Sequence, residues 1–196
     1  MRDIDIRNIL LHTLRQKYGG DSNTLVIEEM GLCQGNARVD VAVVNGSIHG
    51  YEIKSEKDTL KRLSGQQDIY NKVLDYVTVV TCTRHLYKIK QSVPRWWGIS
   101  EVQCINGQIK LVKIRPCKKN KKVNPNELVQ LLWRNETLDI LRERNFHRGL
   151  INRSRNILWN RLVQNISIRE LKKEIRDRIK ARQNWRVVSQ QVSCDG

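Results

Sequence analysis

Two carboxylates and one amine lie on neighbouring strand-like runs in the first third of the chain. Asp40 falls in the run RVDVAVV at 38–44, and Glu52 and Lys54 fall in the run IHGYEIK at 48–54. Because side chains alternate between the faces of a strand, Glu52 and Lys54 point to the same face. Charged groups on an otherwise apolar sheet are costly unless they pair or hold a cation. This combination is what a magnesium-dependent phosphodiester hydrolase needs.

These residue types suit a hard divalent cation. Mg²⁺ takes oxygen ligands, usually one or two protein carboxylates, and keeps waters for the rest of its shell. Asp40 and Glu52 would supply the carboxylates, and the backbone carbonyl of Ile53 would add a neutral oxygen. The cation activates a water and stabilises charge on the scissile phosphate, while Lys54 would orient or deprotonate that water or neutralise the developing charge. We therefore expect Mg²⁺ as the cofactor, with Mn²⁺ able to replace it.

The length of the turn between the two runs decides whether this site can form. Asn45-Gly46 is a typical hairpin-turn dipeptide. A two-residue turn at this position would place Asp40 opposite Tyr51, so that Asp40 and Glu52 would point to opposite faces of the sheet. A shared site therefore requires a turn of three or five residues, or a β-bulge between the two acids.

A plain alternative is that Glu52 and Lys54 lie on the solvated face of a half-exposed strand, because Glu-x-Lys alone is a weak signal. Three features favour a site. Asp40 lies on the neighbouring run, its face is otherwise apolar, and the following helix carries Gln66 and Tyr70 at i, i+4 spacing. We expect Gln66 to lie against the sheet near the carboxylates.

Other chemistries are not favoured by the sequence. The four histidines lack metal-ligand spacing, and the five cysteines are scattered and form no Cys-x-x-Cys pair. A zinc or disulfide framework is therefore not expected, and a reducing compartment fits. No apolar run reaches about 18 residues and the N-terminus lacks the apolar segment of a secretory signal. We predict a cytoplasmic protein without a membrane span.

The basic charge is concentrated in the second part of the chain. Residues 1–83 contain ten Lys and Arg against eleven Asp and Glu, whereas residues 84–196 contain 26 against nine, a net charge of +17 within the total of +16. A basic region separated from the candidate carboxylates suggests a nucleic-acid partner, because neutralising phosphates releases counterions. DNA is the expected partner, with RNA left open. A membrane surface and a simply solvated basic surface are the weaker alternatives.

Hydrophobic periodicity and turn signals predict an α/β sandwich with a mixed sheet. The expected elements, in order, are a helix at 3–17, strands at 24–30, 37–44 and 48–55, a helix at 59–75 capped by Asp58, a strand at 76–82, a helix at 83–92, and a hairpin of strands at 97–103 and 108–115 about Asn106-Gly107.

The composition changes at residue 117. The run KKNKKVNPN is basic and turn-rich, which favours a linker, and the pattern beyond it is helical at about 125–134, 136–145, 153–165 and 168–183. Ser167-x-x-Glu170 is a capping box for the last of these helices. We predict a core domain at 1–117 and a basic all-helical region at 118–196.

The residues above resemble a known family. Asp40, Glu52 and Lys54 resemble the D…E-x-K signature of the PD-(D/E)XK nuclease superfamily, and Gln66-x-x-x-Tyr70 resembles the extra motif of its RecB-like branch. The run at 38–80, with the later LLWRNE, is similar to a group of small uncharacterised bacterial and phage proteins assigned to that superfamily. Similarity to this group spans most of the chain, whereas the superfamily signature covers about residues 25–82. The resemblance implies a restriction-endonuclease-like sandwich and magnesium-dependent cleavage of DNA.

The resemblance also implies roles for single residues. An upstream acid would join Asp40 and Glu52 as a metal ligand; Glu29 is the better match, with Glu28 as the open alternative. Lys54 would be the catalytic cation, and Gln66 and Tyr70 would position the water, the metal shell or the phosphate. Val39 stands where many members of the superfamily have Pro.

Basic residues would contact the nucleic acid. Arg62, one turn before Gln66, is expected near the DNA backbone or in solvent. The residues expected to follow phosphates are Lys118, Lys119, Lys121, Lys122, Arg169, Lys172, Lys173 and Arg176.

The sequence thus favours a metal-dependent deoxyribonuclease. A rival reading is a non-catalytic nucleic-acid-binding protein that uses the basic helices, and a third is a basic scaffold for an acidic protein. The form of the nucleic acid, endonuclease or exonuclease action, and a role in repair or defence stay open. A homodimer would make double-strand cutting easier for so small a chain.

Overall fold

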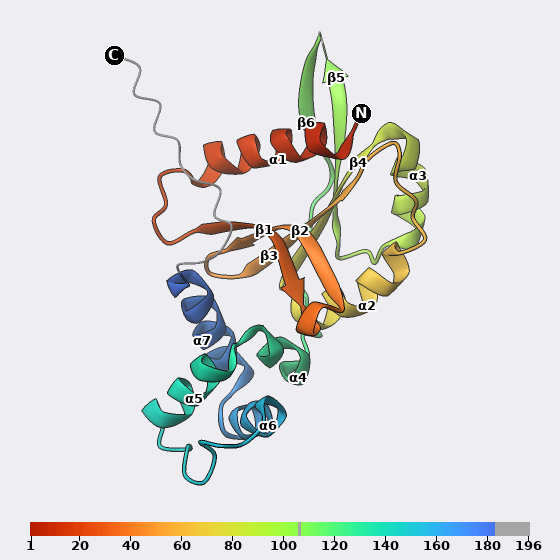
Figure 1. The fold of residues 1–196 in the computed structure, drawn as a ribbon. Helices are drawn as coiled ribbons and strands as arrows, with labels where there is room; N and C mark the ends of the chain where they lie inside the picture. The colour runs from red at the N-terminus through yellow and green to blue at the C-terminus, as the bar shows by residue number, and fades with distance from the viewer. Residues whose placement is uncertain (106, 183–196) are drawn as a thin grey trace, which may run out of the picture.

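A six-stranded mixed sheet forms the centre of the fold, and its strands lie in sequence order (Figure 1). The computed structural model describes residues 1–105 and 107–182. The strands are β1 (Leu25–Leu32), β2 (Ala37–Val44), β3 (Ile48–Lys54), β4 (Tyr76–Cys82), β5 (Gly98–Ile105) and β6 (Gln108–Arg115). Strand β4 is parallel to β3 and β5, and the other neighbouring pairs are antiparallel. The expectation of a mixed α/β architecture is confirmed.

Helices cover both faces of the sheet. The helical segments are α1 (Asp3–Tyr18), η1 (Cys33–Gly35), α2 (Leu63–Val73), α3 (Thr83–Ser92), α4 (Pro125–Leu128), η2 (Val129–Leu131), α5 (Arg134–Glu143), α6 (Arg155–Asn165) and α7 (Ile168–Ala181). Helix α1 packs on one face through Ile6, Leu10 and Leu14. Helices α2 and α3, which make the parallel crossovers, pack on the other face. Within residues 1–105 and 107–182, no helix has the length and apolar character needed to cross a bilayer.

The C-terminal helices share a core with the sheet. Leu171, Ile175 and Ile179 line the inner face of α7 and belong to the same buried cluster as Ile27 of β1 and Val44 of β2. Helices α4–α7 gather at the lower end of the molecule, below the sheet (Figure 1). The C-terminal region is therefore helical, as expected, and it packs directly on the strands. The division at residue 117 stays a prediction.

The segment interpreted as a linker is held against the junction of α2 and β4. Asn120 is buried, and its amide Nδ2 donates to the carbonyl oxygens of Asn71 (2.7 Å) and Leu74 (2.9 Å). The backbone N–H of Asn124 donates to the carbonyl of Lys72. These bonds satisfy carbonyls that the last turn of a helix leaves unpaired. The turn-rich run is thus a cap for α2, and its interpretation as a free linker is wrong.

Two helix boundaries also differ from expectation. Helix α2 begins at Leu63 rather than near 59, because Asp58 accepts hydrogen bonds from the backbone and hydroxyl of Ser55 (both 2.7 Å) and so closes a separate turn. The helix expected at 125–134 is a single α-turn followed by η2. The capping box of Ser167 and Glu170 is confirmed. Asn106, Cys194 and the expected helix end at residue 183 lie outside the described residues.

Replacing Asn120 with Ala should lower the free energy of unfolding by about 1–3 kcal/mol, because two buried carbonyls lose their donor. Urea unfolding of the full chain measures this change. The exposed Asn126→Ala is the matched control and should change stability by less than about 0.5 kcal/mol. Equal stability of Asn120→Ala and the native chain would contradict the capping role.

Candidate active site

A three-residue turn joins β2 to β3 and sets their register. Val44 pairs with Ile48, so the turn consists of Asn45–Ser47, closed by a hydrogen bond from the backbone N–H of Asn45 to the carbonyl of Ser47 (3.0 Å). The side chain of Asn45 accepts further bonds from the backbone and hydroxyl of Ser47. The odd turn length required for a shared site is confirmed.

The two strands separate where the site lies. Their pairing ends at Val41 and Tyr51, and the same register carried one step further sets Asp40 across from Glu52. At this point a side chain replaces the backbone hydrogen bonds between the strands: the Asp40 carboxylate oxygen Oδ2 accepts the backbone N–H of Ile53 at 2.7 Å. The two predicted carboxylates thus meet at the opening between β2 and β3.

Strand β2 is also irregular at Asp40. Val39 and Ala42 belong to the core on the α2 side, whereas Val41 belongs to the core under α1. Strict alternation would place Val39 and Val41 on one face. On the neighbouring strand, Glu29 has φ of 56°, in the left-handed region that non-glycine residues rarely adopt. This local irregularity leaves the Asp40 side chain between the layers, within reach of both α1 and β3.

Glu52 lies at the centre of a buried hydrogen-bond network. Its Oε1 accepts from Lys54 Nζ and Gln66 Nε2, both at 2.7 Å, and its Oε2 accepts from the Tyr70 hydroxyl at 2.6 Å. Lys54 Nζ also donates to Gln66 Oε1 at 3.2 Å. Glu52 and Lys54 are only 2% and 4% exposed. The structure therefore brings together Asp40, Glu52, Lys54, Gln66 and Tyr70, as the sequence predicted.

Helix α2 is positioned by aromatic packing. Tyr70 is fully buried and stacks on Trp97, with ring centroids 5.9 Å apart. The indole N–H of Trp97 donates to the side chain of Asn71 at 2.9 Å. Because Gln66 lies one turn before Tyr70, this packing holds both side chains over the carboxylates.

Burial and a like charge perturb Asp40. Burial, followed by the negative charge of Glu52, raises the pKa of Asp40 to about 7, although the Ile53 N–H and the charges of Arg7 and Lys54 oppose the shift. Two facing carboxylates disfavour each other's charge. Near neutral pH, Asp40 can therefore hold a proton that a bound cation would displace.

Arg7 is a site residue that the sequence did not reveal. Its guanidinium lies 3.4 Å from Asp40 Oδ1, 2.9 Å from Glu29, 3.7 Å from Glu28 and 3.3 Å from Asp3, and it donates to the Asp40 carbonyl at 3.1 Å. Spacing on the helix relates Arg7 to Asp3, but nothing in the sequence relates it to Asp40. Arg7 supplies the positive charge on the α1 side of the site.

The upstream acid is engaged in ion pairs. Glu29 pairs with Arg7 and with Arg38 Nε at 2.5 Å, and it does not line the cleft at Asp40. Across the described part of the chain, no group of three or more His, Cys, Asp and Glu side chains is arranged to hold a metal. The role of Glu29, or of Glu28, as a ligand therefore stays a prediction that requires Arg7 to release it.

The remaining candidate ligands, two carboxylates and a backbone carbonyl, fit one magnesium ion. Mg²⁺ accepts one or two carboxylates, which Asp40 and Glu52 provide. A carboxylate offers about four lone-pair positions. Hydrogen-bond donors occupy three on Glu52 and two on Asp40, counting Arg7. Each acid thus keeps acceptor capacity toward a cation, and the backbone of Ile53 lies beside them at the cleft.

The carboxylates open into a solvent-accessible cleft of about 680 Å³. Asp40, Glu52, Ile53, Lys54 and Gln66 line it, whereas Tyr70 lies behind Glu52. Arg62, just before α2, also lines the cleft, and its contact with a DNA backbone stays a prediction.

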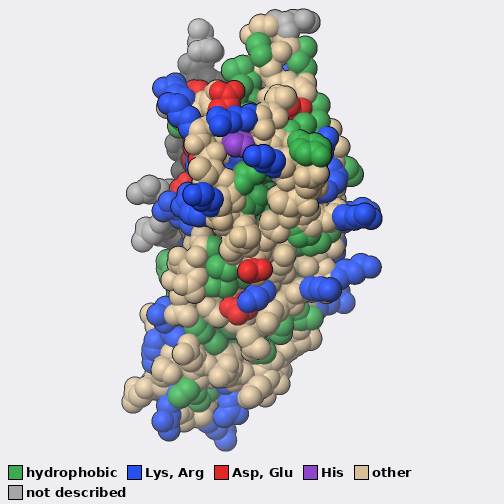
Figure 2. All heavy atoms as spheres, turned by 90° about the vertical axis from the view of Figure 1, so that its right-hand side faces the viewer, with side chains coloured by type: hydrophobic (Ala, Val, Ile, Leu, Met, Phe, Trp, Pro, Cys, Tyr) green, Lys and Arg blue, Asp and Glu red, His purple; other side chains and the backbone are tan. Residues whose placement is uncertain are grey.

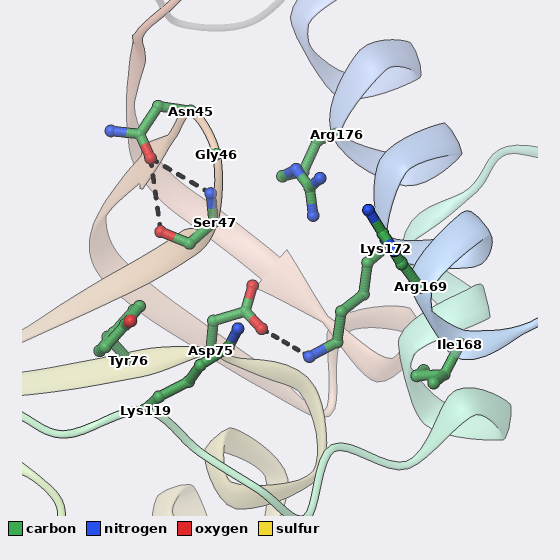
Figure 3. A pocket seen from close by; sticks show the side chains of 10 residues that line it. All are labelled: Asn45, Gly46, Ser47, Asp75, Tyr76, Lys119, Ile168, Arg169, Lys172 and Arg176. Atoms are coloured by element: carbon green, nitrogen blue, oxygen red, sulfur yellow. Dashed lines mark hydrogen bonds and ion pairs between the residues drawn. The ribbon is translucent and has the colours of Figure 1, made fainter.

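The predicted phosphate-contacting residues divide into three groups. Lys119, Arg169, Lys172 and Arg176 line a second pocket (Figure 3). Lys173 pairs with Asp177 on the exposed side of α7. The other three are exposed in the segment before α4: Lys118, Lys121 and Lys122. Figure 2 shows basic side chains along the edges and at the lower end of one face, with few acidic ones among them.

Comparison with known proteins identifies a family. The family described as bacteriophage P4 protein cII matches residues 1–192. The chain belongs to the bacteriophage P4 cII family. Protein cII of Enterobacteria phage P4 is 29% identical over 143 residues, which are 73% of this chain and 54% of that protein, so the chain spans about half the length of this curated relative. A solved structure, the SPO1766 protein of unknown function from Silicibacter pomeroyi, aligns with 78% of this chain and 98% of its own, with a TM-score of 0.46 and 16% identity.

The raised pKa of Asp40 predicts a pH-dependent stability. Its folded pKa of about 7 exceeds the unfolded value of about 3.9, so the folded state binds more protons in between. The free energy of unfolding should therefore fall as pH rises from about 4 to about 7, by at most about 1.4 kcal/mol per pH unit for one proton. Urea unfolding in EDTA should show this fall, and Asp40→Asn should remove it. The half-buried Asp139→Asn, whose native carboxylate pairs with Arg142, should keep the native profile. Identical profiles for all three proteins would contradict the prediction.

Proposed function

We propose that this chain is a magnesium-dependent nuclease of the PD-(D/E)XK superfamily, with a restriction-endonuclease-like core, that hydrolyses phosphodiester bonds of DNA. The observation that carries the proposal is the meeting of Asp40, Glu52, Lys54 and Gln66 in one open cleft, with Tyr70 bound to Glu52 from behind. Their order and spacing are those of the D…E-x-K and Q-x-x-x-Y motifs.

The chain's own residues account for binding and orientation. Glu52 and Asp40 would hold the cation, which when bound neutralises the phosphate and activates the attacking water. An ammonium group has three N–H donors, and Lys54 uses two of them on Glu52 and Gln66. The third is available for a phosphate oxygen, where its charge would stabilise the transition state. Gln66 and Tyr70 fix Glu52 so that it need not reorganise during the reaction.

The basic second part of the chain supports a nucleic acid as the substrate. Residues 84–196 carry a net charge of +17, and Arg62 lies in the cleft itself. A polyanion that releases counterions gains affinity from such a surface irrespective of base sequence. DNA is the proposed partner.

A second candidate function is nucleic-acid binding without catalysis. Arg7 favours it, because this guanidinium neutralises Asp40 and Glu29 without a metal. In that case the carboxylates would serve the fold, and the basic helices would do the binding.

Asp40→Asn and Lys54→Met should each reduce DNA cleavage in Mg²⁺ or Mn²⁺ by about 100-fold or more, because the first removes a carboxylate that would hold the cation and the second removes the positive charge beside the scissile phosphate. Cleavage of supercoiled circular and linear DNA measures the activity, and fluorescence polarisation in EDTA measures binding, which should stay within about twofold. The half-buried Asp139→Asn, outside the cleft, and the exposed Lys88→Met control for charge. Full cleavage by both site variants, with unchanged thermal unfolding, would reject this mechanism, and no cleavage by the native chain would favour the binding protein.

Arg7→Gln should strengthen the stabilisation of the protein by Mn²⁺. Arg7 and a divalent cation would neutralise the same Asp40 carboxylate, so removing the guanidinium removes a competitor. Thermal unfolding across a Mn²⁺ titration measures this effect, because a ligand of the folded state raises its stability. The exposed Arg15→Gln, on the same helix, should respond as the native chain does. Loss of the Mn²⁺ response in Arg7→Gln would instead show that Arg7 positions Asp40 for the cation.

A further inference from the structure

A second pocket of about 450 Å³ lies at the other end of β3 from the candidate active site. The turn Asn45–Ser47 forms one side, the start of β4 at Tyr76 forms the floor, and α7 forms the opposite wall (Figure 3). Ser47 and Glu52 are five residues apart along the strand, or about 17 Å. The pocket is therefore separate from the cleft that holds Asp40 and Glu52.

Four basic side chains converge on this pocket. Arg169, Lys172 and Arg176 follow one another at spacings of three and four residues, so they lie on one face of α7. Figure 3 shows Arg176 extending from α7 into the space that faces the turn and Lys172 extending from α7 to Asp75, while Lys119 lies beside Asp75. Like charges at these spacings repel one another, so this arrangement is unfavourable without an anion.

The acid in the pocket does not neutralise this charge. Asp75 is 4% exposed, and its carboxylate accepts the backbone N–H of Ile48 at 3.0 Å and Lys172 Nζ at 2.6 Å. Asp75 therefore offsets one cation of the four, and it holds Lys172 in place. Three positive charges remain.

The other three cations have no internal partner. In the part of the chain that the structure describes, the side chains of Lys119, Arg169 and Arg176 form no ion pair or hydrogen bond. Neighbouring arginines differ: Arg144 binds Glu170 and Glu174, and Arg178 binds Glu143. Lys119, Arg169 and Arg176 thus meet at the pocket without a partner, whereas Arg144 and Arg178 are neutralised within the fold.

We propose that this pocket binds a phosphate group. Guanidinium groups bind phosphate oxygens in pairs of parallel hydrogen bonds, and Arg169 and Arg176 supply two such groups beside the ammonium groups of Lys119 and Lys172. The Tyr76 ring on the floor of the pocket adds an aromatic surface suited to a nucleotide. The ligand is a phosphate of a nucleotide or of a nucleic-acid strand, and the site does not depend on catalysis in the cleft.

Isothermal titration calorimetry of the full chain in EDTA tests the proposal with three probes: inorganic phosphate, a short single-stranded oligodeoxynucleotide, and the same oligonucleotide with a 5′-phosphate. The double variant Arg169→Gln/Arg176→Gln should weaken binding of at least one probe about tenfold or more, since each charged hydrogen bond is worth about that factor. The matched control, Arg148→Gln/Arg161→Gln, removes two exposed arginines outside the pocket and should weaken binding by less than about twofold.

The probes distinguish the sources of the phosphate. If the pocket variant loses affinity only for inorganic phosphate or only for the 5′-phosphorylated strand, the ligand is a free or terminal phosphate. If it loses affinity equally for both oligonucleotides, the ligand is the strand backbone. Arg176→Lys keeps the charge but not the paired geometry, so it should weaken binding while leaving thermal unfolding unchanged. Equal weakening by the pocket and control variants, or no binding of any probe by the native chain, would overturn the proposal.

Discussion

The buried charge of Glu52 is the constraint that organises the first part of this fold. Removing a carboxylate from water costs several kcal/mol unless neighbouring groups compensate. Lys54, Gln66 and Tyr70 provide that compensation from two different elements, so β3 and α2 must keep one relative position. A network in a low-dielectric interior is favourable only when every member is satisfied. The same contacts that make Glu52 tolerable therefore pre-organise its oxygens at the cleft.

Asp40 obeys a different constraint from Glu52, although the two acids face each other. One hydrogen bond from β3 and the charges of Arg7 and Lys54 offset its charge in part, and its pKa rises to about 7. The free site can thus be neutralised by a proton or by Arg7. Under the proposed function, binding of a divalent cation would be an exchange, in which the proton leaves or the guanidinium withdraws. This exchange would make cleavage sensitive to pH near neutrality.

Local patterns predicted the strands, the odd-length turn and the grouping of five site residues, because a period of two and a turn length together determine which side chains share a face. They could not predict Arg7, which reaches Asp40 across 33 residues through the packing of α1. Local patterns also gave a wrong interpretation of the run after Cys117. Its polar composition is typical of a linker, yet Asn120 caps α2. Composition carries no information about which backbone carbonyls need a hydrogen-bond donor. Asp58 was predicted to cap the following helix, but its carboxylate accepts hydrogen bonds from Ser55 instead.

A buried acid paired with a lysine lies at each end of β3. At one end Glu52 binds Lys54, and at the other Asp75 binds the N–H of Ile48 and Lys172. The second pair joins the C-terminal helices to the sheet, since Lys172 belongs to α7 and Asp75 precedes β4. Breaking a buried pair leaves an uncompensated charge, which costs more than the pair contributes. The helices are therefore fixed to the strands by electrostatics as well as by the shared core, and the basic face of α7 keeps a defined position relative to the cleft.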